Sequence, residues 1–252
     1  MIPRSVEIGP FILHLYGLII AASIYLGWFL ARKRAAAYKI PRHFFDDPIL
    51  IIPLILGIAG ARLYHVVDYW NIYSHDLISI LFINRGGLAI WGGILGAAIG
   101  FLIVAKIKKL EALTVLDLAA PSLLLGQAIG RVANFVNQEG FGPPTTLPWA
   151  VYIEPPNRPP QFSNFAHFHP TFFYEAILNL IFFLLLLYFA KNLKGRGQAF
   201  ALYLIFYSIA RFITEFWRID TAVLVEVKVA HIISIFAFTI GLLLFSTRKR
   251  RG

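Results

Sequence analysis

Three arginines of this chain lie inside long apolar segments, where a charged side chain is costly. They are Arg62, Arg131 and Arg211. An arginine at the middle of a bilayer costs about 2.5 to 3.5 kcal/mol on insertion scales, so such residues usually face a protein interior or a water-filled cavity. The guanidinium group carries several donors in a planar fork that matches carboxylates and anions with several oxygens. These residues therefore predict either structural ion pairs or a buried site for an anion.

Each arginine shares a helical face with other polar side chains, since residues three or four positions apart lie on one side of a helix. The sets are Arg62, His65 and Tyr69; Arg131, Asn134 and Asn137 or Gln138; and Tyr207, Arg211 and Glu215. Structural salt bridges and interhelical hydrogen bonds are the alternative interpretation of each set. Salt bridges do not explain the carboxamides, whereas arginine forks and carboxamide donors together suit a phosphodiester. A phospholipid headgroup is therefore the candidate ligand.

The elements that hold these residues are predicted from composition. Hydrophobic residues make up 58% of the 252 residues and charged residues 14%, which is too little polar material to cover a soluble globule. Apolar segments of about 20 residues, the length that spans a bilayer, cover residues 11–31, 48–69, 87–105, 112–135, 170–190, 197–217 and 229–246. We therefore predict an all-α integral membrane protein with seven transmembrane helices, forming a single membrane domain over residues 1–252. In the third segment, Gly92, Gly96 and Gly100 predict close helix packing.

Basic residues in the connections predict the orientation, because cytoplasmic loops retain lysine and arginine. They cluster within residues 32–42, 106–109, 191–196 and 248–251, whereas the alternate connections carry only Arg4, Arg85, Arg158, Arg218 and Lys228. This pattern predicts an outer N-terminus, a cytoplasmic C-terminus and a small outer-face cap at about residues 138–169. Most polar side chains of the spans then lie in the outer half: His14, Tyr16, Arg62, His65, Asp68, Arg131, His169, Glu175, Arg211, Glu215 and His231.

Several classes of function fit the sequence poorly. The histidines lack the spacing of metal ligands and no nucleotide-binding fingerprint is present, so neither a metal nor another cofactor is predicted. Nucleic acid is a poor partner, because the basic residues form short clusters that flank the apolar segments. A transporter or receptor for an anionic solute is the alternative, although the sequence has no internal repeat and its polar groups gather near one face.

Several stretches resemble, in their order and spacing, those of the prolipoprotein diacylglyceryl transferases over about residues 11–245. They are HLYG, GARLYHVVDYW, RGGLAIWGGILG, GQAIGRVANFVNQEGFG followed by LPWAV, HPTFFYEA and YSIARFITEFWR. The resemblance implies a multi-pass enzyme of the bacterial cytoplasmic (inner) membrane, with its active site facing the outer leaflet. It implies transfer of the diacylglyceryl group of phosphatidylglycerol to the lipobox cysteine of a prolipoprotein signal peptide, giving a thioether and glycerol phosphate in the first step of lipoprotein maturation. This chain has no cysteine, so the protein substrate would bring the nucleophile.

The resemblance also implies site residues. Arg131 and Arg211 match the two critical arginines of the family, and Arg131 lies in its phosphatidylglycerol-binding motif. Tyr207 matches a further family position. Other residues that match family positions or lie in the matching stretches, and that we expect to bind substrate, are Tyr16, Arg62, Asn134, Asn137, Glu139, Gly142, Tyr174, Glu175 and Glu215.

Trp91 departs from the family, which often has a histidine, proposed as a base, at this position. A tryptophan cannot accept the proton, so either Trp91 lines the lipid pocket as a substrate-binding residue or the chain is an inactive phospholipid-binding relative. In the first case we expect Arg131 to hold the donor phosphate and Arg211 to stabilise the departing phosphate or the thiolate. The candidates for relaying the proton are then His14, His65 and a tyrosinate such as Tyr207.

Overall fold

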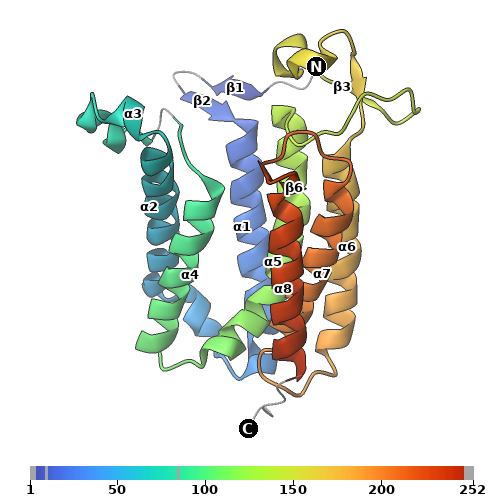
Figure 1. Cartoon of the computed structure of the whole chain (residues 1–252). Helices are drawn as coiled ribbons and strands as arrows, with labels where there is room; N and C mark the ends of the chain where they lie inside the picture. Colours follow the sequence, from blue (N-terminus) through green and yellow to red (C-terminus); the bar gives the residue numbers. More distant parts are fainter. Residues whose placement is uncertain (1–3, 9–10, 84–85, 247–252) are drawn as a thin grey trace. The chain divides into compact units, whose positions relative to one another are not determined.

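The computed structural model describes residues 4–8, 11–83 and 86–246 (Figure 1). Arg85 and the basic residues at 248–251, which contribute to the predicted orientation, lie outside these ranges. The described residues form two compact units. One unit contains residues 39–115, and the other contains the described residues up to 38 and from 116 onward.

Each of the seven apolar segments contains one long helix. These helices are α1 (Leu15–Arg34), α2 (Ile51–Asp68), α4 (Ile90–Ile107), α5 (Ala112–Asn137), α6 (Thr171–Ala190), α7 (Gln198–Glu215) and α8 (Val229–Ser246). Within the described ranges, six helices are long and apolar enough to cross a membrane. Helix α7 is outside this set, because Gln198, Arg211 and Glu215 lower its mean hydropathy. The predicted all-helical membrane character is thereby confirmed.

The first helix begins later than predicted. Residues Phe11–His14 form β2, which pairs antiparallel with β1 (Ser5–Ile8), and α1 starts at Leu15. The prediction of a helix from residue 11 is therefore wrong at this end, because a short apolar run such as FILH fits a strand as well as a helix. At its other end α1 stops at Arg34, after basic residues that interact favourably with the negative end of the helix dipole.

Short elements join the long helices. They comprise the single-turn helix α3 (Trp70–Tyr73) and 3-10 turns at Ala35–Tyr38, Arg42–Asp46, Pro48–Leu50, Leu77–Leu81, Pro155–Asn157 and Pro160–Phe162. Two further antiparallel ribbons pair β3 (Val151–Tyr152) with β4 (His167–Phe168), and β5 (Val223–Leu224) with β6 (Val227–Lys228).

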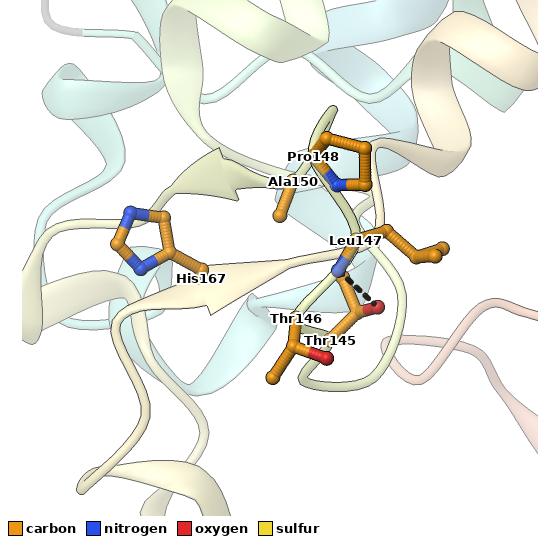
Figure 2. A pocket seen from close by; sticks show the side chains of 6 residues that line it. All are labelled: Thr145, Thr146, Leu147, Pro148, Ala150 and His167. Carbon is orange, nitrogen blue, oxygen red and sulfur yellow. Dashed lines mark hydrogen bonds between the residues drawn. The ribbon is translucent and has the colours of Figure 1, made fainter.

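The segment predicted as a cap, residues 138–169, folds into a compact connection between α5 and α6. Phe141, Ile153 and Phe168 from this segment are buried together with Phe172 at the start of α6. The segment contains a hollow of about 360 Å³. Figure 2 shows the side chains that line it: Thr145, Thr146, Leu147, Pro148, Ala150 and His167. This apolar cluster packs the connection against the start of α6. The cluster thereby holds the end of α5 and the start of α6 in place.

In the unit of residues 39–115, α2 and α4 lie side by side (Figure 1). A Cβ atom added to Gly92 would stand 2.1 Å from the carbonyl oxygen of Gly60, and one added to Gly96 would stand 2.0 Å from that of Leu56. Gly100 meets a similar constraint against the start of α2. Because these distances are far below van der Waals contact, only glycine allows the two backbones to approach so closely. The predicted close packing of this glycine ridge is confirmed.

In the other unit, α5 contacts both α1 and α7. Ser122 on α5 donates from Oγ to the carbonyl oxygen of Gly27 on α1, over 2.7 Å. The carboxylate of Asp117 accepts hydrogen bonds from the backbone nitrogens of Gly197 (2.8 Å) and Phe200 (3.0 Å), so it caps the first turn of α7. These contacts fix the position of α7 along the axis of α5. The polar residues of the two helices are thereby placed relative to one another.

Candidate active site

Arg131 on α5 reaches a carboxylate on the neighbouring helix α6. Its Nη2 atom donates to Glu175 Oε1 over 2.6 Å, and its Nη1 atom donates to Asn134 Oδ1 over 2.9 Å. Glu175 is only 1% exposed. A carboxylate so deeply buried needs a charged partner, because an unpaired charge inside a protein is strongly destabilising. Arg131 and Glu175 therefore tie α5 to α6 at this level.

Arg211 on α7 engages the second oxygen of the same carboxylate. Its Nη1 atom lies 3.3 Å from Glu175 Oε2, and its Nη2 atom lies 2.6 Å from Glu215 Oε2, one turn further along α7. Glu215 is fully buried. In the described part of the chain neither of its carboxylate oxygens receives a well-aligned hydrogen bond. Its contact with Arg211 is therefore an ion pair without a hydrogen bond. Arginines from two separate helices thus converge on one carboxylate.

A third arginine joins this group, which we call the arginine cluster: Arg131, Arg211, Arg218, Glu175 and Glu215. Arg218 follows the end of α7, and its Nη1 atom lies 3.9 Å from Glu175 Oε2. Its Nη2 atom pairs with Asp220 Oδ1 over 3.1 Å. With Asp220 included, three guanidinium groups face three carboxylates. An anion that binds between these forks therefore competes with the carboxylates that now contact them.

Sequence reasoning missed Arg218 as a site residue and counted it among the basic residues of a loop. A signal was present in the sequence, because Arg218 follows Glu215 by three residues, a spacing that brings two side chains to one helical face. The loop is held close to the cluster by two further contacts. Lys228 Nζ donates to the carbonyl oxygens of Glu215 and Arg218, each over 2.6 Å.

Polar residues predicted at the site surround the cluster. Asn134 donates from Nδ2 to Glu139 Oε1 over 2.8 Å. Tyr16 on α1 lies within electrostatic range of the charges of Glu139 and Arg131. Tyr207, one turn before Arg211 on α7, is within range of Glu175 and of all three arginines of the cluster. Residues from four helices, α1, α5, α6 and α7, thus meet around the guanidinium groups.

Other predicted residues in this unit support the cluster or lie apart from it. Gly142 donates from its backbone nitrogen to the carbonyl oxygen of His169 over 2.8 Å, and a Cβ atom there would stand 2.6 Å from the carbonyl oxygen of Trp217. The Tyr174 hydroxyl instead contacts His169 Nδ1 at 3.1 Å. Asn137 is the half-buried last residue of α5, and His14 is exposed at the junction of β2 and α1.

Arg62, His65 and Trp91 belong to the unit of residues 39–115. The guanidinium group of Arg62 donates to backbone carbonyl oxygens of Ser79 (2.6 Å), Ile80 (2.8 Å), Gly86 (2.8 Å) and Gly87 (3.1 Å), and stands over the ring of Tyr73. His65 packs against the rings of Tyr69 and Tyr73. Trp91 is 54% exposed. The contacts of Arg62 favour a structural clamp on the connection between α2 and α4.

The chemistry available at the arginine cluster is that of anion binding and charge stabilisation. Guanidinium forks in a site with little access to water stabilise developing negative charge far better than exposed ones. Among the residues that the structure describes, no group of three or more His, Asp and Glu side chains could hold a metal ion. The cluster therefore presents fixed positive charge from side chains, with tyrosine hydroxyl groups nearby.

Comparison with known proteins gives consistent matches over nearly the whole chain. The family model described as prolipoprotein diacylglyceryl transferase matches residues 3–247. The phosphatidylglycerol--prolipoprotein diacylglyceryl transferase of Trichormus variabilis is 41% identical over 247 residues, which cover 95% of this chain and 87% of that protein. The proteins of the same name from Acaryochloris marina and Fervidobacterium nodosum are each 41% identical, over 96% and 93% of this chain and 88% and 81% of their own lengths.

Proposed function

Because the chain belongs to the prolipoprotein diacylglyceryl transferase family, we propose that its arginine cluster holds the phosphate of the lipid donor. The chain is a multi-pass membrane transferase that moves the diacylglyceryl group of phosphatidylglycerol to a prolipoprotein. The observation that carries the proposal is the convergence of Arg131 and Arg211, from different helices, on the buried carboxylate of Glu175. Guanidinium groups held in this way are already oriented toward one point, as a phosphate with several oxygens requires.

In the proposed reaction the thiolate of a lipobox cysteine attacks C3 of the donor glycerol. A carbon–sulfur bond forms while the bond from C3 to the phosphate oxygen breaks, which gives a thioether and releases glycerol phosphate. Negative charge builds on the departing oxygen. Arg131 holds the donor phosphate and Arg211 stabilises this charge, since donors that are oriented beforehand need no reorganisation at the moment of reaction. Glu175 and Glu215 hold the guanidinium groups in position. The further substrate-binding residues in this proposal are Tyr16, Asn134, Asn137, Glu139, Gly142 and Tyr174.

The thiol proton needs an acceptor, and Tyr207 is the candidate that we favour over His14 and His65. Its position on α7, one turn before Arg211, supports this assignment because it places the tyrosine next to the arginine cluster, where the thiol must attack. His14, by contrast, is exposed at the start of α1. Trp91 then has no role in proton transfer and lines the path of the lipid.

We further propose that the reaction takes place at the outer leaflet of the bacterial inner membrane. In this proposal the whole chain forms a single membrane domain with seven spans, an outer N-terminus and a cytoplasmic C-terminus, and residues 138–169 form an outer-face cap. The basic residues at 32–42, 106–109 and 191–196 support this orientation. Helix α7 serves as a span despite its polar residues, because Arg211 and Glu215 pair with protein groups and not with lipid.

The test combines purified protein with labelled phosphatidylglycerol and a lipobox peptide. We expect label on the peptide with the unchanged chain, and a loss of kcat of roughly 100- to 1,000-fold in Arg131→Ala and Arg211→Ala, the usual effect of removing one charge-stabilising donor. Arg42→Ala, which removes an exposed arginine of a loop, is the matched control and should keep full activity. Normal transfer by either cluster variant contradicts the assignment, and uptake of an anionic solute into vesicles without transfer favours the transporter alternative.

A further inference from the structure

Glu175 occupies the place between the guanidinium groups that a donor phosphate would need. Its Oε1 atom is bound by Arg131 at 2.6 Å, and its Oε2 atom is approached by Arg211 at 3.3 Å and by Arg218 at 3.9 Å. A phosphodiester carries one negative charge and offers its free oxygens to the same forks. The carboxylate and the phosphate are therefore competitors for one set of donors.

A residue that could receive the displaced carboxylate lies one turn further along α6. Asn179 is 0% exposed, and among the described residues neither its Nδ2 nor its Oδ1 atom has a hydrogen-bond partner. A buried carboxamide without partners is destabilising and calls for an explanation. Side chains on a helix lean toward its N-terminus, so residue 179 covers the turn that carries residue 175. Residues 175 and 179 therefore lie on the same face of α6, one turn apart.

We propose that Glu175 is a displaceable counter-ion at the donor site and that Asn179 is the residue that receives it. This inference rests on the proposed function of the arginine cluster. Without donor, Glu175 keeps the guanidinium groups of Arg131 and Arg211 oriented. When phosphatidylglycerol binds, its phosphate takes these donors, and Glu175 turns about its side-chain bonds to accept a hydrogen bond from Asn179.

The exchange keeps the guanidinium groups paired. One singly charged phosphodiester takes the place of one carboxylate on the forks, while Glu215 stays paired with Arg211. The displaced carboxylate of Glu175 stays buried, so the hydrogen bond from Asn179 is needed to offset part of the cost of losing its ion pairs. The site is therefore never left with unpaired buried arginines, which would be strongly destabilising. After transfer, the returning carboxylate of Glu175 competes with the phosphate of the product, so the same residue favours release of glycerol phosphate. Glu175 and Asn179 are positioning residues in this scheme, since neither contacts the reacting carbon.

The first measurement uses Asn179→Leu, which keeps the branching and the number of heavy atoms of the side chain and removes its donor. Glu175 then has no alternative partner and holds the arginines more firmly. We expect the KM for phosphatidylglycerol, and its dissociation constant measured with labelled lipid in detergent micelles, to rise roughly tenfold, as for loss of one hydrogen bond to a charged group. The kcat at saturating donor should change less than about threefold, because the chemical step does not involve Asn179.

The second measurement uses Glu175→Gln alone and together with Asn179→Leu. The neutral amide competes weakly for guanidinium groups, so we expect the KM for phosphatidylglycerol to fall several-fold in the single variant. In the double variant Asn179→Leu should no longer raise the KM, since there is no carboxylate to receive. This loss of the effect is a coupling between the two residues that an independent structural role of Asn179 would not produce.

Ser208→Ala is the matched control for removing a buried polar atom. Its Oγ atom also lacks a hydrogen-bond partner among the described residues, but it lines the groove between α7 and α8, so the KM for phosphatidylglycerol should stay unchanged. The inference is overturned if Asn179→Leu leaves the KM unchanged, or if it raises the KM equally with Glu175 and with Gln at position 175. It is also overturned if Glu175→Gln binds the donor more weakly than the unchanged chain while its melting temperature is retained.

Failure of the proposed function gives a different result, because the unchanged chain would then transfer no diacylglyceryl group and Arg131→Ala would bind phosphatidylglycerol as tightly as the unchanged chain. If Glu175→Gln does not fold, Glu175→Asp replaces it. The shorter side chain withdraws the carboxylate from the guanidinium groups and competes less. The KM should then fall, and the effect of Asn179→Leu on it should shrink; an undiminished effect in the Glu175→Asp background overturns the inference.

Discussion

The arginine cluster and Arg62, which clamps the connection between α2 and α4, show the same pattern in the sequence, but their arginines bind different partners in the structure. Each has an arginine within an apolar segment, sharing a helical face with other polar residues. Arg62 is 6% exposed and donates to the backbone carbonyls of a connection, and the described residues include no carboxylate paired with it. Arg131 and Arg211 instead bind side-chain carboxylates from helices.

The difference lies in what can be exchanged. Backbone carbonyls are neutral and cannot turn away without rearranging the loop, so the donors of Arg62 hold the backbone at residues 79–80 and 86–87 against α2. A side-chain carboxylate can rotate away, and an anion of equal charge can take its place. An arginine bound to carboxylates on flexible side chains is therefore suited to receive a ligand, whereas an arginine saturated by carbonyls is suited to stabilise a fold.

The sharpest test of this contrast is Arg62→Ala. It removes the donors of several carbonyl oxygens, and we expect the free energy of unfolding in detergent to fall by about 3 kcal/mol, since hydrogen bonds to charged groups contribute strongly. Transfer activity per folded molecule should stay within a few-fold of the unchanged chain. An unaltered melting temperature combined with lost transfer would instead assign Arg62 to substrate binding, the role that the resemblance implies.

Tyr207 and Tyr73 offer a matched pair, since each lies near an arginine of its own region. Tyr207→Phe removes the proposed proton acceptor, and kcat should fall roughly 100-fold, as for loss of a general base. Tyr73→Phe keeps the ring that Arg62 stands over and should leave kcat unchanged. The two are compared by kcat at saturating donor and peptide. Equal rates in both variants would remove Tyr207 from the reaction.

The helices were predictable from the sequence because about 20 apolar residues leave the backbone no other way to satisfy its hydrogen bonds in a bilayer. Even α7 forms where its apolar pattern predicts it, despite Arg211 and Glu215. The start of α1 was not predictable, because the pairing of Phe11–His14 with Ser5–Ile8 depends on a hairpin that a run of apolar residues does not encode.

The sequence predicted a polar site around the buried arginines, but it did not predict which carboxylate each arginine binds. Buried arginines need partners, so a polar group around Arg131 and Arg211 follows from their positions in apolar segments. Which carboxylate each one takes depends on the rotation of α5, α6 and α7, and no spacing along one helix specifies that. Asn179 follows Glu175 by four residues, yet its lack of partners becomes visible only once the neighbouring helices are in place.

Trp91→His tests whether the unit that holds Arg62 also supplies the base. If Tyr207 accepts the proton, a histidine at position 91 adds nothing to the chemical step, and kcat should change less than about threefold. The measurement is transfer from labelled phosphatidylglycerol to a lipobox peptide, beside Trp91→Phe as the control for removing the indole. A rise of about 100-fold in the histidine variant alone would assign the base to this position and identify the chain as a weakened relative.

The smallest effect on stability is expected at an exposed ion pair. This pair lacks the several backbone hydrogen bonds of Arg62 and the burial of the arginine cluster. Lys108 donates a hydrogen bond to Asp47, and together with the backbone nitrogen of Ile49 it holds the pKa of Asp47 below its ordinary value of 3.8. A carboxylate with a lowered pKa stabilises the fold above its unfolded pKa, and this contribution is lost as the pH falls through the folded value. The melting temperature of the unchanged chain should therefore drop slightly more than that of Asp47→Asn as the pH falls below about 4. Because water screens this pair, the difference above that pH should be small. A large difference between the two melting temperatures above that pH, which disappears below it, would contradict the expected ranking of exposed pairs beneath buried ones.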